Sequence, residues 1–567
     1  MASPTTFPSD WHPCKGCACV NHAIPSYRFS VTDADGPLID HPDIGKLARS
    51  NDVPDPSEEK ILQKMMSDTG QRIDAVDTQV LELKALRQAF VVRVDKELAA
   101  LDKERQRLSD SIRERQSVLS ALRRMPKEVL AHIFSHTLVF PFPRGKSPHL
   151  WSSFSASRHP LLSFELVSRN WKDVLDTFPN LWSYVNILID RMSSITYAHY
   201  VGNQLSRSRH CPLSVSICHS GSYSATWPGA FPSFMLVALF SVNRRIQTLH
   251  LCLPGNHFVD MQQFHLSFPT LQELVLLSSY STSEVAQHLH FGSLPNLRVF
   301  HATDISNVDK LSLPWHQITH FTNIHEVAGR GLSAPRAQSI LKMMSCVSVC
   351  RISIDFQSTM TGVVEQTTLS KLHSLTLSSV CRQGSGLQCV ISPVLNSFIL
   401  PTLLDLSVIC SFGGTSNTTF TSVRQLIERS HSPLTTLYFD FESIMKDDLI
   451  HILSNTPTLQ DLPLTKTRGI TDEVLHHLAR RVDTESDSQI PALVPRLHTL
   501  HLSGYLDFQV EVYVQMVESR WTCRPRHLKS VDLSSLYLKG VNKGARTPAL
   551  SRLDALRSEG LDVVMRT

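Results

Sequence analysis

The chain has 567 residues, of which 42% are hydrophobic and 19% charged, and its 55 basic and 51 acidic residues leave a formal net charge of only +4. This length predicts two to four domains, and this charge balance gives no indication of a nucleic-acid or membrane surface. No apolar run approaches the roughly 20 residues of a membrane span, and the polar start lacks the apolar core of a secretory signal. We therefore expect a cytoplasmic or nuclear protein whose 12 cysteines are mostly reduced.

The N-terminal segment, residues 1–57, is rich in Pro, Ser, Asp and His and shows no sustained periodicity. This composition predicts a disordered tail. Cys14, Cys17 and Cys19 lie there near two histidines, and thiolates and imidazoles at such spacing can bind zinc. Because no second pair of ligands follows at a distance that would close a small domain, we predict no metal site and no cofactor. The role of the three cysteines stays open.

Residues 58–122 have no proline, one glycine and a composition of good helix formers. The heptad positions that begin at residue 73 are Ile73, Val80, Arg87, Val94, Leu101, Leu108, Arg115 and Leu122. The companion apolar stripe moves one place after Val94, to Leu98, Ile112 and Leu119. This pattern predicts a long amphipathic helix, or a helical hairpin, with an imperfect coiled-coil seam. Homodimerisation through this seam and packing on the protein's own body both stay open, and the seam arginines argue against a strong dimer.

Residues 123–190 predict a helical module. Pro126 suits a first helical position, and apolar residues then recur at helical spacing on one face. A loop rich in proline follows from Pro141 to Pro160. After it, Leu166, Val167, Trp171, Val174 and Leu175 make a second apolar helical face.

The order of these residues resembles the F-box. The matching residues are Met125-Pro126, Glu128, Ile133-Phe134, Leu166-Val167-Ser168, Trp171, and Pro179 with Leu181-Trp182. The chain departs from the motif at Met125, which replaces leucine, at Ser168, which replaces cysteine, and in a longer loop over residues 135–162. A preceding coiled-coil helix also recurs in fungal F-box proteins, which this chain resembles.

The resemblance implies a module that docks on the Skp-type adaptor of a cullin–RING ubiquitin ligase. A small helical unit cannot bury all of its apolar side chains, so some of them have surface to offer a partner helix. The adaptor-binding residues that the resemblance implies are Met125, Pro126, Val129, Leu130, Ile133, Phe134, Val167 and Trp171.

The rest of the chain repeats the phrase Leu-x-x-Leu-x-Leu, often with proline two residues before it. Copies begin at Ile246, Leu271, Leu297, Val349, Leu372, Leu403, Leu434, Leu459, Leu497 and Leu528. Helical patterns often separate the copies, so residues 191–540 resemble a leucine-rich-repeat solenoid in which each unit buries its apolar residues against its neighbours. Because the steps are uneven and the usual asparagine ladder is missing, we predict an α/β fold with a parallel sheet in an irregular horseshoe. Residues 541–567 are predicted to be a C-terminal tail.

The alternate positions of each predicted strand face away from the core. They are polar and mixed in charge, which suits protein recognition, although such residues can also be simply solvated. The candidate substrate-binding residues are Arg351, Asp405, Tyr438 and His501.

No motif of an enzyme is present in the sequence, and we predict no catalytic residue. The predicted function is substrate recognition in a Skp–cullin–F-box ubiquitin ligase, with the adaptor, through it a cullin, and an unidentified protein substrate as partners. The alternative is a scaffold built from a coiled coil and repeats, with no role in ubiquitination. A third hypothesis is an enzyme whose site is assembled from distant residues. We expect neither nucleic acid nor membrane as a partner.

Overall fold

The structure is a computed structural model of the full chain. It describes residues 11–12, 24–25, 46–47, 49, 52–138, 160–189, 195–218, 241–261, 265–279, 289–305, 307–325, 330–355, 366–380, 391–411, 417–441, 444–467, 469–479, 481–482, 489–490, 493–523, 525–539 and 548–566. The chain divides into two units, Met1–Arg124 and Met125–Thr567. Most of the predicted disordered tail, including Cys14, Cys17 and Cys19, lies outside the described residues.

In the first unit the strands β1 (Trp11–His12) and β2 (Ile24–Pro25) pair antiparallel, and the main element is the helix α2 (Pro56–Val118). Asp55 caps α2, because its Oδ1 accepts the backbone N–H groups of Ser57 at 2.7 Å and Glu58 at 2.9 Å. The Glu58 carboxylate accepts the Asp55 N–H in return at 2.9 Å, which makes a reciprocal cap. The predicted helix is thus one continuous helix and not a hairpin, and the short α3 (Ala121–Arg124) follows it.

The second unit begins with a small helical module. Its elements are α4 (Lys127–Thr137), α5 (Pro160–Glu165), α6 (Arg169–Thr177) and the 3-10 helix η3 (Pro179–Trp182). Ser168 caps α6 by accepting the Trp171 N–H at 3.2 Å, and the Trp182 indole N–H donates to the Leu175 carbonyl at 3.0 Å. These four elements close a core of their own, made of Leu130, Ala131, Phe134, Leu161, Val174, Leu175, Leu181 and Trp182.

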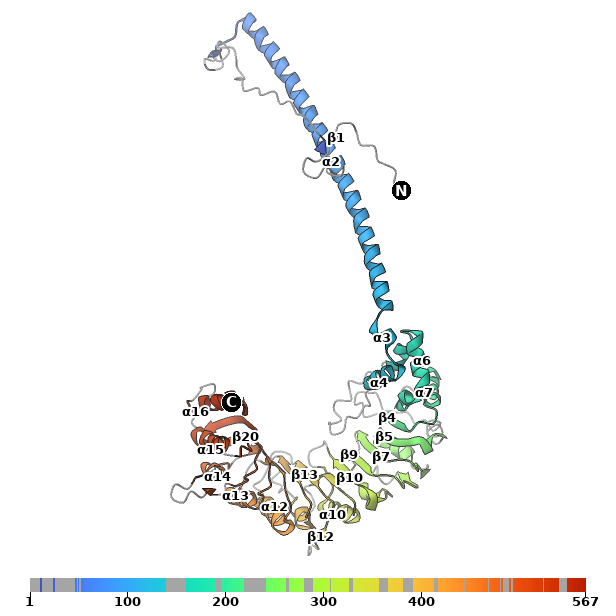
Figure 1. Ribbon diagram of the computed structural model, residues 1–567, viewed down its shortest axis with the longest axis vertical. Coiled ribbons are helices and arrows are strands. Elements are labelled where there is room, and N and C mark those ends of the chain that lie inside the picture. Colours follow the sequence, from blue (N-terminus) through green and yellow to red (C-terminus); the bar gives the residue numbers. More distant parts are fainter. Residues whose placement is uncertain are drawn as a thin grey trace. The chain divides into compact units, whose positions relative to one another are not determined.

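A 14-stranded sheet follows, in which the strand order is the chain order and every neighbouring pair is parallel (Figure 1). Its strands are β3 (Tyr184–Leu188), β4 (Leu213–Cys218), β5 (Ile246–Pro254), β7 (Glu273–Ser279), β9 (Val299–Thr303), β10 (His320–Ile324), β11 (Val349–Ser353), β13 (Ser374–Val380), β15 (Asp405–Ser411), β16 (Thr436–Phe441), β17 (Asp461–Thr467), β20 (Thr499–Gln509), β21 (Ser530–Lys539) and β22 (Asp562–Arg566). The predicted α/β fold with N-terminal helices and a long parallel sheet is confirmed.

Helices and short elements connect the strands. The helices are α7 (Ile195–Arg207), α9 (Gly255–Asp260), α10 (Ala334–Met343), α11 (Ser392–Asn396), α12 (Asn417–Ser430), α13 (Lys446–Ser454), α14 (Asp472–Leu478), α15 (Val510–Thr522) and α16 (Pro548–Ser558), with 3-10 turns η5 (Asn243–Arg245), η7 (Val308–Lys310) and η8 (Trp315–Gln317). Short strand pairs also lie in the connections. They are β6 (His265–Leu266) with β8 (His290–Phe291), β12 (Thr367–Thr368) with β14 (Phe398–Ile399), and β18 (Arg481–Val482) with β19 (Gln489–Ile490).

The array of strands extends beyond both predicted ends. β3 lies inside the segment 123–190 that was predicted to be purely helical, and α16 and β22 lie inside the predicted tail 541–567. Both predictions of the ends are wrong for one reason. The register aligns Val185 and Val563 with the second leucine position of the repeated phrase, but the first leucine position, three residues earlier, holds Trp182 or Gly560. In β4 that first position holds Pro212. A search for the leucine phrase therefore stops two units early at the N-terminal end and one unit early at the C-terminal end.

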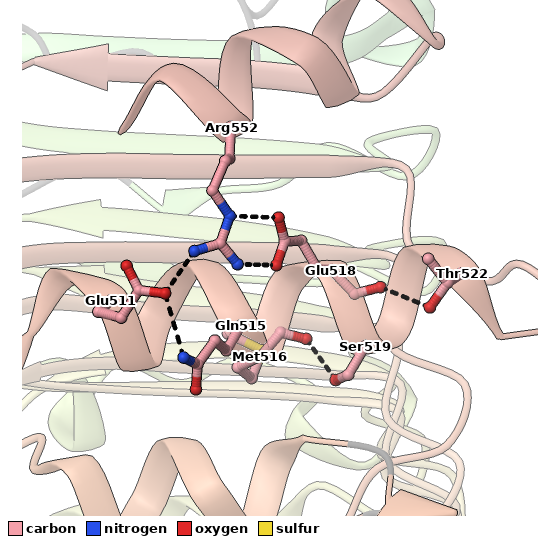
Figure 2. A network of polar contacts seen from close by, with 7 residues as sticks. All are labelled: Glu511, Gln515, Met516, Glu518, Ser519, Thr522 and Arg552. Carbon is pink, nitrogen blue, oxygen red and sulfur yellow. Dashed lines mark hydrogen bonds and ion pairs between the residues drawn. The ribbon is translucent and has the colours of Figure 1, made fainter. Parts of the chain in front are cut away.

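Figure 2 shows how the last helix is tied to the array. The Arg552 guanidinium of α16 donates two parallel hydrogen bonds to the Glu518 carboxylate of α15, with Nε 2.8 Å from Oε1, and a third to Glu511. Gln515 also donates to Glu511, at 3.1 Å. The hydrogen bonds from Arg552 and then Gln515 hold the pKa of Glu511 below its usual range. Residues 548–566 are therefore part of the array.

Hydroxyl groups link neighbouring repeats. In three copies of the phrase Pro-Thr-Leu the threonine donates to a backbone carbonyl of the preceding repeat. Thr270 donates to Ile246 at 2.9 Å, Thr402 to Leu372 at 3.1 Å, and Thr458 to Leu434 at 2.7 Å. The Asn296 amide does the same with the Pro269 carbonyl at 2.7 Å. The threonine beside the proline therefore links one repeat to the next.

Arginines make a second kind of link between repeats. The last carbonyls of a helix have no partner within the helix. Arg429 of α12 donates to the carbonyl of Leu395 in the last turn of α11 and to that of Phe398 in β14, the latter at 2.9 Å. Arg520 of α15 donates through Nε to Leu478, the last residue of α14, at 2.6 Å, and through Nη1 to Val494 at 3.0 Å. Arg520 is only 4% exposed, so it is a structural part of the core.

Candidate functional site

The outward face of the sheet holds the predicted substrate-binding residues. The strand register aligns one row of outward positions across all 14 strands. The row reads Asn186, Ser216, His250, Val275, His301, Thr322, Arg351, Thr376, Ser407, Tyr438, Pro463, His501, Asp532 and Val564. Most of the residues before and after them in the strands are core residues such as Cys350 and Leu437, so the row faces away from the core.

Arg351, Tyr438 and His501 share this row, and Asp405 lies in the next row, aligned with Thr436. Neighbouring strands are about 4.8 Å apart, so three strand steps separate Arg351 from Tyr438 by about 14 Å. Two steps separate Tyr438 from His501 by about 10 Å. The four candidates are therefore on one face but too far apart to bind one small molecule together, and their spacing suits an extended partner.

Neighbouring polar groups hold two of these side chains in place. The Tyr438 hydroxyl accepts a hydrogen bond from Thr465 Oγ1 at 3.1 Å. His501 Nδ1 lies 2.9 Å from an Asp532 carboxylate oxygen, and the Ser534 hydroxyl donates to the other oxygen of Asp532 at 2.8 Å. Because their rotamers are held before any partner arrives, Tyr438 and His501 would lose little conformational freedom on binding.

The register gathers outward carboxylates toward one end of the sheet. The outward positions of β15 to β22 include the carboxylates of Asp405, Asp461, Asp532 and Asp562. The outward positions of β5 to β11 include His250, His301, His320 and Arg351, together with the carboxylate of Glu273. In the sequence the same residues read only as a mixed set, because the gathering of these carboxylates depends on strand order.

Two residues of this row are not available to a partner. Ser216 and His250 are buried, although their row faces away from the core. Burial lowers the pKa of His250 to about 3, with a smaller contribution from His301. The alternation of the strand predicted that this side chain is solvated, and that prediction is wrong.

The helical module separates its apolar residues into a buried and an exposed set. Leu130 and Phe134 are both 1% exposed, and the Phe134 ring lies 4.7 Å from Phe164 and 4.8 Å from Trp171 between ring centroids. Met125 and Trp171 pack partly against the same core. Leu130 and Phe134 therefore cannot contact an adaptor directly, and the prediction that they do is wrong, because α5 and α6 cover that side of α4.

The exposed set lies on α4 and on the turn between α5 and α6. Val129 and Ile133 are one helical turn apart on α4, and Ile133 is 41% exposed. Val167 is 57% exposed and Leu166 is 85% exposed. Pro126 is also exposed. Leu166 was not among the predicted adaptor contacts, and the signal that could have found it is Ser168, a helix cap that places the two residues before it outside a helix.

Two further observations concern the described parts of the chain. Among these residues no three His, Cys, Asp or Glu side chains gather into a group that could hold a metal ion. No helix within the same ranges is long and apolar enough to cross a membrane.

Comparison with known proteins does not assign a family. No family model matches the chain, and no curated protein matches it. Among solved structures, a protein from Bacteroides fragilis is 15% identical, with a TM-score of 0.25, over 44% of this chain and 64% of its own. The yeast complex of Rad7 and Elc1 is 13% identical, with a TM-score of 0.28, over 72% of this chain and 98% of the matched chain. The chain thus spans under two thirds of the Bacteroides protein, and neither similarity is close enough to carry an argument about function.

Proposed function

We propose that this protein is a substrate receptor of a Skp–cullin–F-box ubiquitin ligase, in the cytoplasm or the nucleus. In this proposal the helical module binds the Skp-type adaptor, and through it a cullin. The outward face of the sheet binds a protein substrate without catalysis. The observation that carries the proposal is the exposed apolar set of the module, Val129, Ile133, Leu166 and Val167.

These residues are exposed beside a core that is already closed. The module buries two large aromatic side chains, Phe134 and Trp182, without using any of the exposed set. Apolar groups left in water cost about 25 cal/mol for each Å², and contiguous exposed apolar patches mark interaction sites. The F-box resemblance of the module gives the partner class, a helical adaptor.

The outward face supports the second half of the proposal. It carries anchored polar and aromatic groups at intervals over several strands, and Tyr and Arg are the residue types most often found at binding hot spots. If the array curves into the predicted horseshoe, this face lies on its inner side. The alternative function is a scaffold with no role in ubiquitination, which the exposed apolar residues of α2 would also serve. Adaptor binding separates the two.

We predict that Ile133→Asp combined with Val167→Asp abolishes co-purification of the full chain with a Skp-type adaptor. A buried interface anchor contributes about 2 kcal/mol or more, which is about 30-fold in affinity, and a carboxylate in its place adds a desolvation cost. The matched control is Met445→Asp, a similarly exposed apolar residue of the array, which should leave the adaptor bound. Undiminished binding by the double variant, with its circular dichroism unchanged, would contradict the proposal.

Phe134 is not a suitable target for that test. Truncation of a buried phenylalanine costs about 3–5 kcal/mol through the cavity that it leaves. Because Phe134 packs between α5 and α6, Phe134→Ala would unfold the module. Loss of adaptor binding in that variant would report folding and not contact.

For the substrate, we predict that Arg351→Ala combined with Tyr438→Ala weakens binding at least tenfold. Each change removes a hydrogen-bonding group from the outward face but no residue from the core. Once affinity purification has identified a substrate, titration calorimetry measures the change. The control is Lys342→Ala combined with Met343→Ala, a cation and a large apolar residue exposed on α10. If only the control weakened binding, the substrate site would lie on the helical side of the array.

A further inference from the structure

We infer that α2 pairs with α2 of a second copy of this chain in an antiparallel coiled coil centred near Val94. The inference is independent of the proposed function, because adaptor binding uses α4 and the turn after α5. It rests on the exposed seam of α2 and on the positions of the charged residues within and beside that seam.

The helix α2 carries a long apolar surface that the described residues of its unit leave exposed. From Met66 to Val118, each large apolar side chain whose exposure is described is between 38% and 74% exposed. The described residues of its own unit therefore bury none of them. A continuous helix of 63 residues is about 95 Å long. A partner that covers its apolar surface must therefore be of similar length. A second copy of the same helix has this length.

The apolar residues follow two heptad frames. In the first frame the core positions are Leu62, Met66, Thr69, Ile73, Val76, Val80, Leu83, Arg87, Phe90 and Val94. In the second frame they are Leu98, Leu101, Arg105, Leu108, Ile112 and Arg115. The step from Val94 to Leu98 is a four-residue insertion of the kind that a coiled coil absorbs by local unwinding.

A parallel pair in register is disfavoured by its charges. Three core positions would each place two guanidinium groups in one layer, since every residue faces its own copy. At positions beside the core, Glu97 would lie next to Asp102 of the second copy, and these two carboxylates repel each other. Arg72 would lie next to Asp77 of the second copy, and this attraction opposes that repulsion. The three core arginines are Arg87, Arg105 and Arg115.

An antiparallel pair removes all three of these repulsive layers. With Val94 facing Val94, each arginine faces an apolar residue of the second copy, and its aliphatic stem can cover that residue while the charge reaches water. Arg105 already extends to Asp102 of its own helix, at 3.3 Å. The layers pair Phe90 with Leu98, Arg87 with Leu101, Leu83 with Arg105, Val80 with Leu108, Val76 with Ile112 and Ile73 with Arg115.

The flanking charges favour the same arrangement. In this register Lys84 lies beside Asp102 of the second copy, and Arg93 lies beside Glu97. Each attraction occurs twice, because the pair is symmetric. Charges that flank the seam set the partner and the orientation in coiled coils, so core and flanks select the antiparallel pair together.

The overlap is large enough for a stable interface. Residues 73–115 of each copy overlap within α2, over about 63 Å at 1.5 Å for each residue. They include ten apolar core residues: Ile73, Val76, Val80, Leu83, Phe90, Val94, Leu98, Leu101, Leu108 and Ile112. Burial of about 60 Å² on each of these in both copies removes about 1,200 Å² from water, which reaches the range of specific interfaces.

The first test is the mass of the full chain in solution. Sedimentation equilibrium at about 10 μM should give twice the chain mass. Val80→Asp, which places a carboxylate in the core of the seam, should weaken association at least tenfold. Leu81→Asp is the matched control, since this neighbour is more exposed and lies off the seam, and it should leave the dimer intact. A monomer for the unaltered chain, or equal loss in both variants, would overturn the pairing.

The second test determines the orientation. The full chain with Ile73→Cys and Arg115→Cys is oxidised, and the cross-linked peptides are mapped by mass spectrometry. The antiparallel pair should link residue 73 of one copy to residue 115 of the other. Links of 73 to 73 and 115 to 115 would show a parallel pair and overturn the inferred orientation. The absence of both kinds of link in a chain that sediments as a dimer would overturn the seam itself.

Discussion

Replacement of Arg520 with methionine is expected to lower the free energy of unfolding of the C-terminal repeats by about 3 kcal/mol or more. The Arg520 guanidinium donates to the backbone carbonyls of Leu478, Leu493 and Val494. An acceptor left buried without a donor costs about 1–3 kcal/mol. Methionine has a similar length and stays apolar, so the lost hydrogen bonds and not a cavity account for the effect.

For two reasons, the loss of stability is expected at the end of α14 and in the segment that contains Val494. Leu478 ends α14, so Arg520 supplies the donor that the end of that helix lacks. Val494 has a φ of 54°, which is a left-handed conformation that a β-branched residue rarely adopts. Its carbonyl accepts from Arg520 at 3.0 Å, and the variant would release this segment as well.

Urea unfolding of the full chain, followed together with hydrogen exchange of α14 and α15, measures the effect. The matched control is Arg496→Met, an exposed arginine of the same region, which should change stability by less than about 0.5 kcal/mol. We expect faster exchange at the end of α14 in the Arg520 variant alone. Equal stability of the two variants would show that water replaces the guanidinium without cost.

A decrease of pH from 7.5 to 5.5 is expected to cost the array about 3 kcal/mol of stability. Burial lowers the pKa of His250 to about 3 and, with the charge of Arg330, that of His325 to about 4. The unfolded chain binds these protons near pH 6.5 and the folded chain does not. Stability is therefore complete above pH 6.5 and falls toward the folded pKa values. At pH 5.5 each histidine contributes a loss of about 1.4 kcal/mol.

The nearby carboxylates do not reverse this direction. Glu273 lies 3.9 Å from a ring nitrogen of His250, and Asp304 lies 3.8 Å from one of His325. Both distances exceed a hydrogen bond, so burial, which disfavours the charged imidazole, is the larger effect. The window above pH 5.5 also lies above the ordinary pKa of carboxyl groups, so it reports the histidines.

Urea unfolding at several pH values tests this expectation. His250→Gln combined with His325→Gln should remove most of the slope between pH 7.5 and 5.5, whatever its effect on stability at neutral pH. His316→Gln, at an exposed histidine, should keep the slope. A slope that persists in the double variant would place the protons on other groups.

Local patterns in the sequence predicted the strands and the long helix. The alternation in a phrase such as Leu403-x-x-Leu406-x-Val408 needs no distant information, since a strand turns successive side chains to opposite faces. The structure places these residues in the core. The same holds for α2, whose composition and heptads determine a helix within one segment.

From the sequence, the adaptor-binding candidates could be predicted only as one set of apolar residues, without a division into buried and exposed members. Ile133 and Phe134 are adjacent and both apolar, so helical periodicity does not decide which of them is covered. The decision depends on α5 and α6, which follow a loop and bring Phe164 and Trp171 against Phe134. Burial is a property of the elements that pack together, and their arrangement is not a local property of the chain.

By itself, the sequence determined the repeating strand–helix unit and the α2 seam, because both depend on the spacing of apolar residues along one segment. The tertiary structure decided which polar residues form hydrogen bonds with one another and which share a face of the sheet. Arg520 reaches the carbonyl of Leu478, 42 residues away, and the strand register gathers the carboxylates of Asp405, Asp461, Asp532 and Asp562 in one part of the sheet. The physical reason is that hydrogen bonds and charges act through space over a few ångströms, and only stacking of the repeats brings such distant residues within that range.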